Sequence, residues 1–149
     1  MGQRVRGAPE FFGVLPLMAV ALFALNNGVL KRAFPGFVTG KLSDLLISFF
    51  LPLFVSALLE RLSRLDVGPR VAAGIALTAA IFLAVKTSAT ASAVLDRDIA
   101  LVLQPFGIRT APNRVDVTDL CALPMLAFAW LHARRSTLAG PPALERAPQ

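Results

Sequence analysis

Four long apolar runs, separated by short clusters of charged residues, constrain this chain more than any other feature. They cover residues 12–30, 42–59, 71–85 and 117–131. Hydrophobic residues make up 56% of the chain and charged residues only 16%, which is fewer charges than a water-soluble domain of this length carries. Because a backbone in lipid must satisfy its hydrogen bonds internally, such runs cross a bilayer as helices. The sequence therefore predicts an all-α integral membrane protein with four transmembrane helices.

The four predicted spans pair into two hairpins within a single domain of residues 1–135. Turn signals in residues 31–41 join the first pair, and residues 63–69 lead from the second span to the third. The first apolar run continues past Asn26 and Asn27 without a small-residue cleavage site, so we expect an uncleaved span. Residues 136–149, which include Gly-Pro-Pro, are predicted to form a disordered tail.

The second and fourth spans begin with similar polar residues, which indicates an internal repeat. Ser43-Asp44-Leu45 opens one run and Thr118-Asp119-Leu120 opens the other. A proline follows in each run, eight residues after the first aspartate and five after the second. We interpret the hairpins as diverged parallel copies, related by an axis along the membrane normal.

The connection between the third and fourth spans, residues 87–118, is the longest stretch outside the spans. Residues 99–108 in its middle are apolar but too short to cross a bilayer, which predicts an interfacial helix or a segment folded back onto the bundle. Connections of this length are usually functional or disordered. Since this one is too hydrophobic for disorder, we expect a structured loop.

The net charge of +6 comes from basic residues at the ends of the apolar runs. Lys and Arg at these places anchor helix ends at lipid headgroups. No aromatic residues alternate with a basic stripe, so the lipid bilayer rather than nucleic acid is the expected partner. Arginines precede the first span, and three of the basic residues on the opposite side of the membrane lie in the long loop, where positive charge resists translocation less. Both observations predict that the two termini are cytoplasmic.

A layer of polar residues is predicted near the outer boundary of the bilayer. Each span separates its charged ends by nearly the same length: Glu10 to Asn26, Asp44 to Glu60 and Arg70 to Lys86 are 16 residues apart, and Asp119 to Arg134 is 15. At about 1.5 Å per residue, each separation is roughly 24 Å. The candidate ligand or ion-pair layer comprises Asn26, Asn27, Lys41, Ser43, Asp44, Lys86, Thr118 and Asp119.

Two main interpretations of this layer remain open. In the first, Lys86 pairs with Asp44 and Asp119, the asparagines donate hydrogen bonds to the carboxylates, and the layer is a substrate, lipid or ion site. In the second, which we favour, the aspartates and their neighbouring hydroxyl residues cap helix starts and form structural ion pairs. A divalent cation completed by Asp96, Asp98 or Asp116 is a third possibility, but we expect neither a metal nor a cofactor.

No catalytic residue is predicted. The histidine, His132, falls at the end of the fourth span opposite the polar layer, where it is expected to be an interfacial anchor, and Cys121 is expected to be a small buried residue. A helix face formed by small residues in the third span predicts close helix packing, either within the bundle or with a second copy. Its members are Ala72, Ala76, Ala80 and Ala84.

Residues 26–50, with Leu30-Lys31, Pro35-Gly36 and the TGKLSD sequence at 39–44, resemble a family of small bacterial multi-pass membrane proteins. The TDL-x-ALP sequence at 118–124 is similar to the second half of that family. The resemblance implies a location in the bacterial inner membrane and implies no reaction. A weaker likeness is to the VanZ-like small membrane proteins, but this chain has no histidine in the corresponding region, and no residue role is carried over.

The leading functional hypothesis is a non-enzymatic binding or accessory protein that uses the polar layer and the 87–118 loop to bind a membrane protein or lipid. The runner-up is an ion- or proton-coupled transporter or oligomeric channel, because two repeats would place ionisable residues at matching depths. A membrane-embedded enzyme acting on lipid headgroups is third, and a holin-like pore former is fourth.

Overall fold

The computed structural model describes residues 7–106 and 115–138, and every regular element among them is a helix. The predicted all-α class is confirmed. In chain order the elements are α1 (Val14–Leu25), the π-helix η1 (Asn26–Leu30), α2 (Lys31–Ala33), α3 (Phe37–Leu62), α4 (Val67–Thr87), α5 (Ala89–Leu103), the 3-10 helices η2 (Gln104–Phe106) and η3 (Val117–Ala122), and α6 (Pro124–Leu138).

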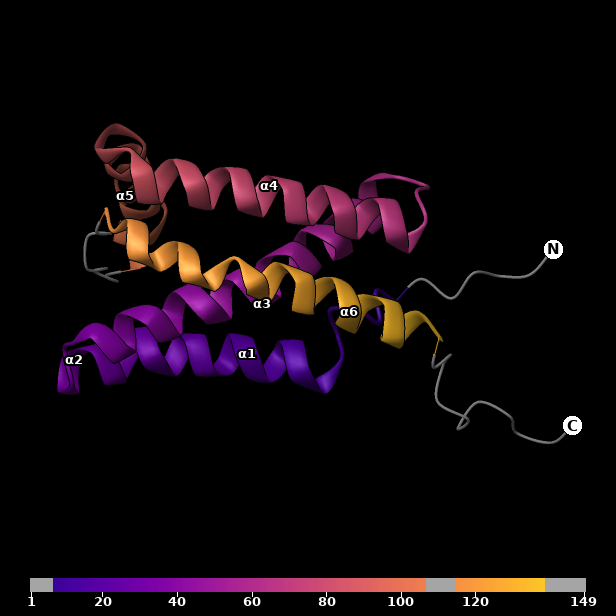
Figure 1. Ribbon diagram of the computed structural model, residues 1–149, viewed down its shortest axis with the longest axis horizontal. Helices are drawn as coiled ribbons and strands as arrows, with labels where there is room; N and C mark the ends of the chain where they lie inside the picture. The colour runs from indigo at the N-terminus through magenta and orange to yellow at the C-terminus, as the bar shows by residue number, and fades with distance from the viewer. Residues whose placement is uncertain (1–6, 107–114, 139–149) are drawn as a thin grey trace, which may run out of the picture.

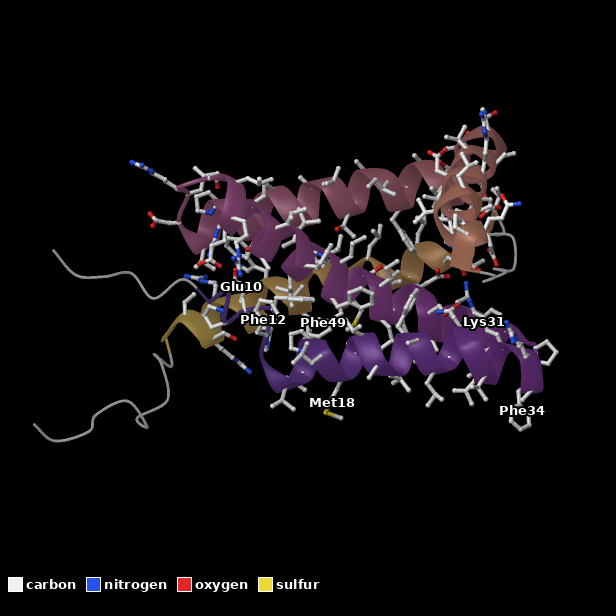
Figure 2. The ribbon with its side chains drawn as sticks, turned by 180° about the vertical axis from the view of Figure 1, so that it is seen from behind. Glu10, Phe12, Met18, Lys31, Phe34 and Phe49 are labelled. Atoms are coloured by element: carbon white, nitrogen blue, oxygen red, sulfur yellow. The ribbon has the colours of Figure 1, made fainter. Side chains whose placement is uncertain are left out.

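Three segments are long and apolar enough to cross a membrane: Val14–Ala33, which runs from α1 through α2, and the helices α3 and α4. Most of their side chains face outward, as Met18 does in Figure 2. An apolar surface this extensive is stable against lipid rather than water. These three segments are therefore compatible, in length and composition, with the predicted transmembrane helices. The expected fourth span is divided between η3 and the 15 residues of α6.

Helices α1, α3, α4 and α6 run side by side, and α3 contacts the other three (Figure 1). The apolar core lies where α3 meets α1, α4 and α6, and contains Phe49 and Leu53 together with Ala19, Val71 and Ala129. Figure 2 shows Glu10 at one end of the bundle and Lys31 at the other. We call the first the Glu10 end; the connection from α3 to α4 lies there. We call the second, which contains Lys31 and the last turn of α4 with Lys86, the Lys86 end; α2, α5 and η3 lie there.

Helix α3 begins five residues earlier than the sequence predicted. Gly36, in an extended conformation, precedes the helix, and the Thr39 hydroxyl lies within hydrogen-bond distance of the carbonyl oxygens of Phe34 and Gly36 (3.1 and 3.0 Å). The predicted turn at residues 31–41 is therefore partly helical. Since Ser43 and Asp44 lie in the second turn of α3, the interpretation of these two residues as helix caps is wrong.

The long connection contains a helix that starts earlier than expected. The Ser88 hydroxyl accepts a hydrogen bond from the Ala91 backbone N–H (3.3 Å) and caps α5. Helix α5 lies across the end of α4 (Figure 1) and covers only the first part of the predicted interfacial segment 99–108. Residues 107–114 lie outside the described part of the chain. At the C-terminal end, α6 extends to Leu138, so residues 136–138 of the predicted tail are helical, and residues 139–149 are not described.

The close helix contact that small residues predicted is present, but on the opposite face of α4. Ala72, Ala76, Ala80 and Ala84 are all exposed, whereas Gly74 is buried against α3. A Cβ atom at Gly74 would lie 2.3 Å from the carbonyl oxygen of Pro52. The absence of a side chain at residue 74 thus permits backbone contact between α3 and α4. Self-association through the exposed alanines stays a prediction.

We expect Gly74→Ala to lower the free energy of unfolding by about 2 kcal/mol, because the added methyl group meets helix backbone that cannot move aside easily. Gly68→Ala is the matched control on the same helix, since a Cβ there meets nothing within 4 Å. Thermal unfolding in detergent, followed by the fluorescence of Trp130, measures both variants. Equal melting temperatures for the two would contradict the close contact.

Candidate functional site

Two asparagines at the end of α1 anchor a hydrogen-bond network with α3. The Asn26 amide donates to the Thr39 carbonyl (2.7 Å) and to the Ser43 hydroxyl (2.8 Å). The Ser43 hydroxyl lies 3.3 Å from the side-chain oxygen Oδ1 of Asn27, which also accepts a hydrogen bond from the Lys31 ammonium (2.8 Å). We call these five residues the asparagine network. The asparagines donate to α3 and α1 rather than to carboxylates, so that part of the sequence prediction is wrong.

The π-helix η1 positions this network. It begins at Asn26, and a π turn is wider than an α turn and is frequently found at functional sites. Asn26 is fully buried, and its side-chain oxygen, Oδ1, has no hydrogen-bond partner among the described residues. One acceptor therefore remains available inside the bundle at this point.

A second network joins α3, α4 and η3 through alternating charges. The Lys86 ammonium donates to Asp44 Oδ2 (3.1 Å) and to Asp119 Oδ2 (2.7 Å), and the Lys41 ammonium pairs with Asp119 Oδ1. Lys41 also donates to the Thr118 hydroxyl (2.6 Å). Lys86 and Asp119 are both buried. We call these five residues the lysine–aspartate chain. A buried charge is stable in such a place only when it is paired in this way.

Asp116, rather than Asp119, caps the start of η3. Its Oδ1 accepts hydrogen bonds from the Thr118 backbone N–H (2.8 Å) and the Thr118 hydroxyl (2.7 Å), and its Oδ2 lies 3.9 Å from the Lys41 ammonium. The two hydrogen bonds from Thr118, together with the charge of Lys41, hold the pKa of Asp116 below its usual value. The capping interpretation of Thr118-Asp119 is therefore wrong, because Asp119 points to the lysines.

The eight residues of the predicted layer thus belong to two adjacent networks. Asn26, Asn27 and Ser43 lie in the asparagine network, and the other five form the lysine–aspartate chain. Sequence reasoning missed Lys31 and Thr39, which belong to the asparagine network. It named Asp116 only as a possible cation ligand, whereas this residue contacts Thr118 and Lys41 of the lysine–aspartate chain. Lys31 lies four residues after Asn27, and this helical spacing was the available signal.

Several other sequence expectations can be placed on the structure. Asp96 and Asp98 lie on α5, and within the described residues no group of three or more His, Cys, Asp or Glu side chains is close enough to hold a metal ion. Cys121 is exposed, so its predicted burial is wrong. The residue lies on η3, where the neighbouring Ala122 is the one that faces inward.

A second charged cluster, at the Glu10 end, was not predicted. Glu10 and Arg70 are 0% and 3% exposed. Glu10 Oε1 accepts a hydrogen bond from the Ser56 hydroxyl (2.8 Å) and from the Arg70 guanidinium (3.3 Å), which also pairs with Glu60 (3.2 Å). We call these four residues the arginine–glutamate cluster. The bundle encloses Glu10 and Arg70, and Glu60 is partly buried beside them.

His132 lies at this end of the bundle, and its expected role as an interfacial anchor stays a prediction. It is half-buried, and its ring meets Phe49 edge-on at 5.7 Å between centroids. Its Nε2 lies 3.4 Å from the Ser136 hydroxyl on the next helical turn. A pocket of about 390 Å³ opens nearby between α4 and α6, with Val71, Trp130 and Arg134 in its lining.

No protein-family model, curated protein or solved structure matches this chain. The resemblance to the small bacterial membrane proteins with a TGKLSD sequence therefore stays a prediction.

We expect Lys86→Ala to lower the free energy of unfolding by about 3 kcal/mol, because it leaves Asp44 as a charge without its ammonium partner. Adding Asp44→Asn should recover much of this loss. Adding Asp119→Asn to Lys86→Ala instead should recover less, because Asp119 still pairs with Lys41. Chemical unfolding in detergent measures the three variants, with Arg61→Ala, at an exposed charge, as the control. Simple additivity of the losses would contradict the pairing.

We expect the stabilisation from Asp116 to depend on pH. A carboxyl group whose folded pKa is lowered stabilises the fold fully above its unfolded pKa of about 3.9, and the effect is lost as pH falls through the folded value. The melting temperature of Asp116→Ala should therefore lie below that of the unchanged protein at pH 5–7. The two should converge as the pH falls through the lowered folded pKa of Asp116. A difference that persists at low pH would contradict the charged cap.

Proposed function

We propose that the protein is a non-enzymatic bacterial inner-membrane protein that binds a second membrane protein through its Lys86 end, with α5 as the main contact element. The observation that carries this proposal is the position of α5. The helix packs on α4 and leaves Val94, Leu101 and Val102 53%, 59% and 65% exposed. A helix lying at the end of a bundle with an apolar exposed side fits the membrane interface, where a partner helix can cover it.

The proposal includes four membrane crossings. Residues 117–138, which form η3 and α6, lie alongside α3 and α4 (Figure 1). We take this segment as the fourth span, which places the start of α1 and the end of α6 on one side of the membrane. The arginines that precede the first span favour the cytoplasm for that side. Two hairpins related as parallel repeats fit this arrangement.

The pairing of the aspartates with lysines favours a binding function over an enzyme that hydrolyses lipid headgroups. A nucleophilic mechanism requires a nucleophile beside a base that can activate it. In the lysine–aspartate chain, Asp44 and Asp119 face lysines, and these contacts hold α3, α4 and η3 together. The chain thus gives the Lys86 end a fixed shape on which α5 is presented, and rigid presentation reduces the entropy lost on binding.

We expect a photo-crosslinking residue at Leu101 to form a discrete protein adduct in native membranes, because this side chain lies on the exposed side of α5. The matched control is the same residue at Leu58, which is 50% exposed on α3 near the Glu10 end. Adding Val94→Glu should remove the adduct without lowering the melting temperature, since Val94 is exposed. Lipid adducts alone at Leu101, or the same protein adduct at both positions, would contradict the proposed contact.

A further inference from the structure

The pocket between α4 and α6 lies at the Glu10 end of the bundle, where the two helices diverge in the view of Figure 1. Its volume of about 390 Å³ falls within the range of sites that hold small ligands. We call it the α4–α6 pocket. Its lining includes Val67 and Val71 of α4, and Trp130, Ala133, Arg134 and Thr137 of α6.

The floor of the α4–α6 pocket is apolar. Val71 and Ala133 are 1% and 2% exposed and belong to the apolar core of the bundle. Val67 and Trp130 are half-buried and pack against the same core. A hydrocarbon chain laid on this floor buries apolar surface and leaves no polar group without a partner. The floor therefore fits the apolar part of a ligand.

The mouth of the pocket is polar and carries a positive charge. Arg134 and Thr137, which line the pocket, are both exposed. Glu10 and Glu60 pair with Arg70 rather than with Arg134, so neither carboxylate neutralises the charge at the mouth. A guanidinium binds a phosphate group through two parallel hydrogen bonds. The mouth therefore fits a phosphate group.

The exposed charges at this end of the bundle are mostly positive. Among the described residues, they are Arg61, Arg64, Asp66, Arg134 and Arg135. The four arginines outnumber the one aspartate and give this end an excess of positive charge. A lipid with a net negative charge is attracted there, whereas the choline cation of a zwitterionic lipid is repelled. The charge therefore favours an anionic lipid over a zwitterionic one.

The groups of the pocket follow the order of the groups in a phospholipid. Trp130 and Arg134 are four residues apart on α6, so they share one face of the helix and are separated by about 6 Å along its axis. Arg134 lies nearer the end of the helix and thus nearer the headgroups. Tryptophan is enriched at the boundary between hydrocarbon and headgroups. A lipid with its phosphate at Arg134 therefore places its glycerol and upper acyl chain beside Trp130.

We propose that the α4–α6 pocket binds an anionic glycerophospholipid, with the phosphate on Arg134 and an acyl chain against Trp130 and Val71. Basic pockets between membrane helices bind such headgroups in other proteins. The site lies at the opposite end from the proposed partner contact on α5 and does not depend on it. It rests on the proposed membrane crossing by residues 117–138, because that crossing places Trp130 in the bilayer.

The test uses the fluorescence of Trp130, which is the single tryptophan of the chain and lines the pocket. The full-length protein is reconstituted in vesicles of phosphatidylcholine and phosphatidylglycerol, and the acyl chains of one lipid at a time carry bromine. Brominated lipid quenches a tryptophan that it contacts. The quenching curves should show that phosphatidylglycerol binds beside Trp130 about fivefold more tightly than phosphatidylcholine does.

Arg134→Gln should remove most of this preference, because it removes the cation that faces the phosphate. Arg135→Gln is the matched control, since it removes the same charge from the next residue, which is not part of the pocket lining. Thr137→Phe should also reduce the preference, because a larger side chain narrows the mouth. All three residues are exposed, so the variants should keep the melting temperature of the unchanged protein.

Two results would overturn the lipid site and leave the membrane crossing intact. The first is equal quenching by the two brominated lipids, and the second is an equal loss of preference in Arg134→Gln and Arg135→Gln. If neither lipid quenches Trp130, the lipid site is also wrong. Acrylamide, a quencher dissolved in the water, then tests the crossing separately, because strong quenching by acrylamide would contradict the proposed crossing as well.

Discussion

The contact between α3 and α4 is the interaction on which the rest of the structure depends. Lipid supplies no hydrophobic driving force between helices, so membrane helices associate through close packing and polar contacts. Here Gly74 allows the two backbones to meet at Pro52, and ion pairs join the same two helices at both ends. Helices α1 and α6 then pack on the remaining faces of α3. The bundle is thus built around one polar and closely packed pair.

The two ends of this pair differ in chemistry. At the Lys86 end, lysines and aspartates alternate, and each Asp119 oxygen faces an ammonium group. At the Glu10 end, one guanidinium lies between two glutamates, and a glutamate oxygen remains without a partner among the described residues. The first arrangement fixes α3, α4 and η3 together and supports the presentation of α5. The second arrangement joins the segment before α1 to α3 and α4 through Glu10.

The sequence predicted which polar residues lie at one level, because helix rise is constant and the charged residues are 15 or 16 positions apart. The same spacing also aligned Glu10, Glu60 and Arg70 at the opposite end, but the sequence did not reveal that the bundle encloses Glu10 and Arg70. A charge near the end of an apolar run has the same local pattern whether it faces headgroups or a partner helix. Burial of Glu10 depends on Ser56 and Arg70, which are distant in sequence.

Local signals also failed where tertiary contacts decide the backbone. Thr39-Gly40 has the composition of a turn, yet it lies within α3, where the Thr39 carbonyl accepts a hydrogen bond from Asn26. The π-helix that begins at Asn26 has no sequence signature. On α4, the regular alanine spacing drew attention to one face, whereas the less regular face with Gly74 and Thr78 makes the contact. Small residues indicated close packing correctly, but not its direction.

The most direct test of this account is a solid-state NMR measurement of side-chain proximity in lipid bilayers, with nitrogen-labelled lysine and arginine and carbon-labelled aspartate and glutamate. The account predicts that Lys86 lies within ion-pair distance, about 4 Å, of Asp44 and Asp119, and that Arg70 lies equally close to Glu10. It also predicts that the Arg70–Glu10 pair is protected from bulk water. Lysine and arginine side chains that extend to the headgroups, far from these acids, would contradict it.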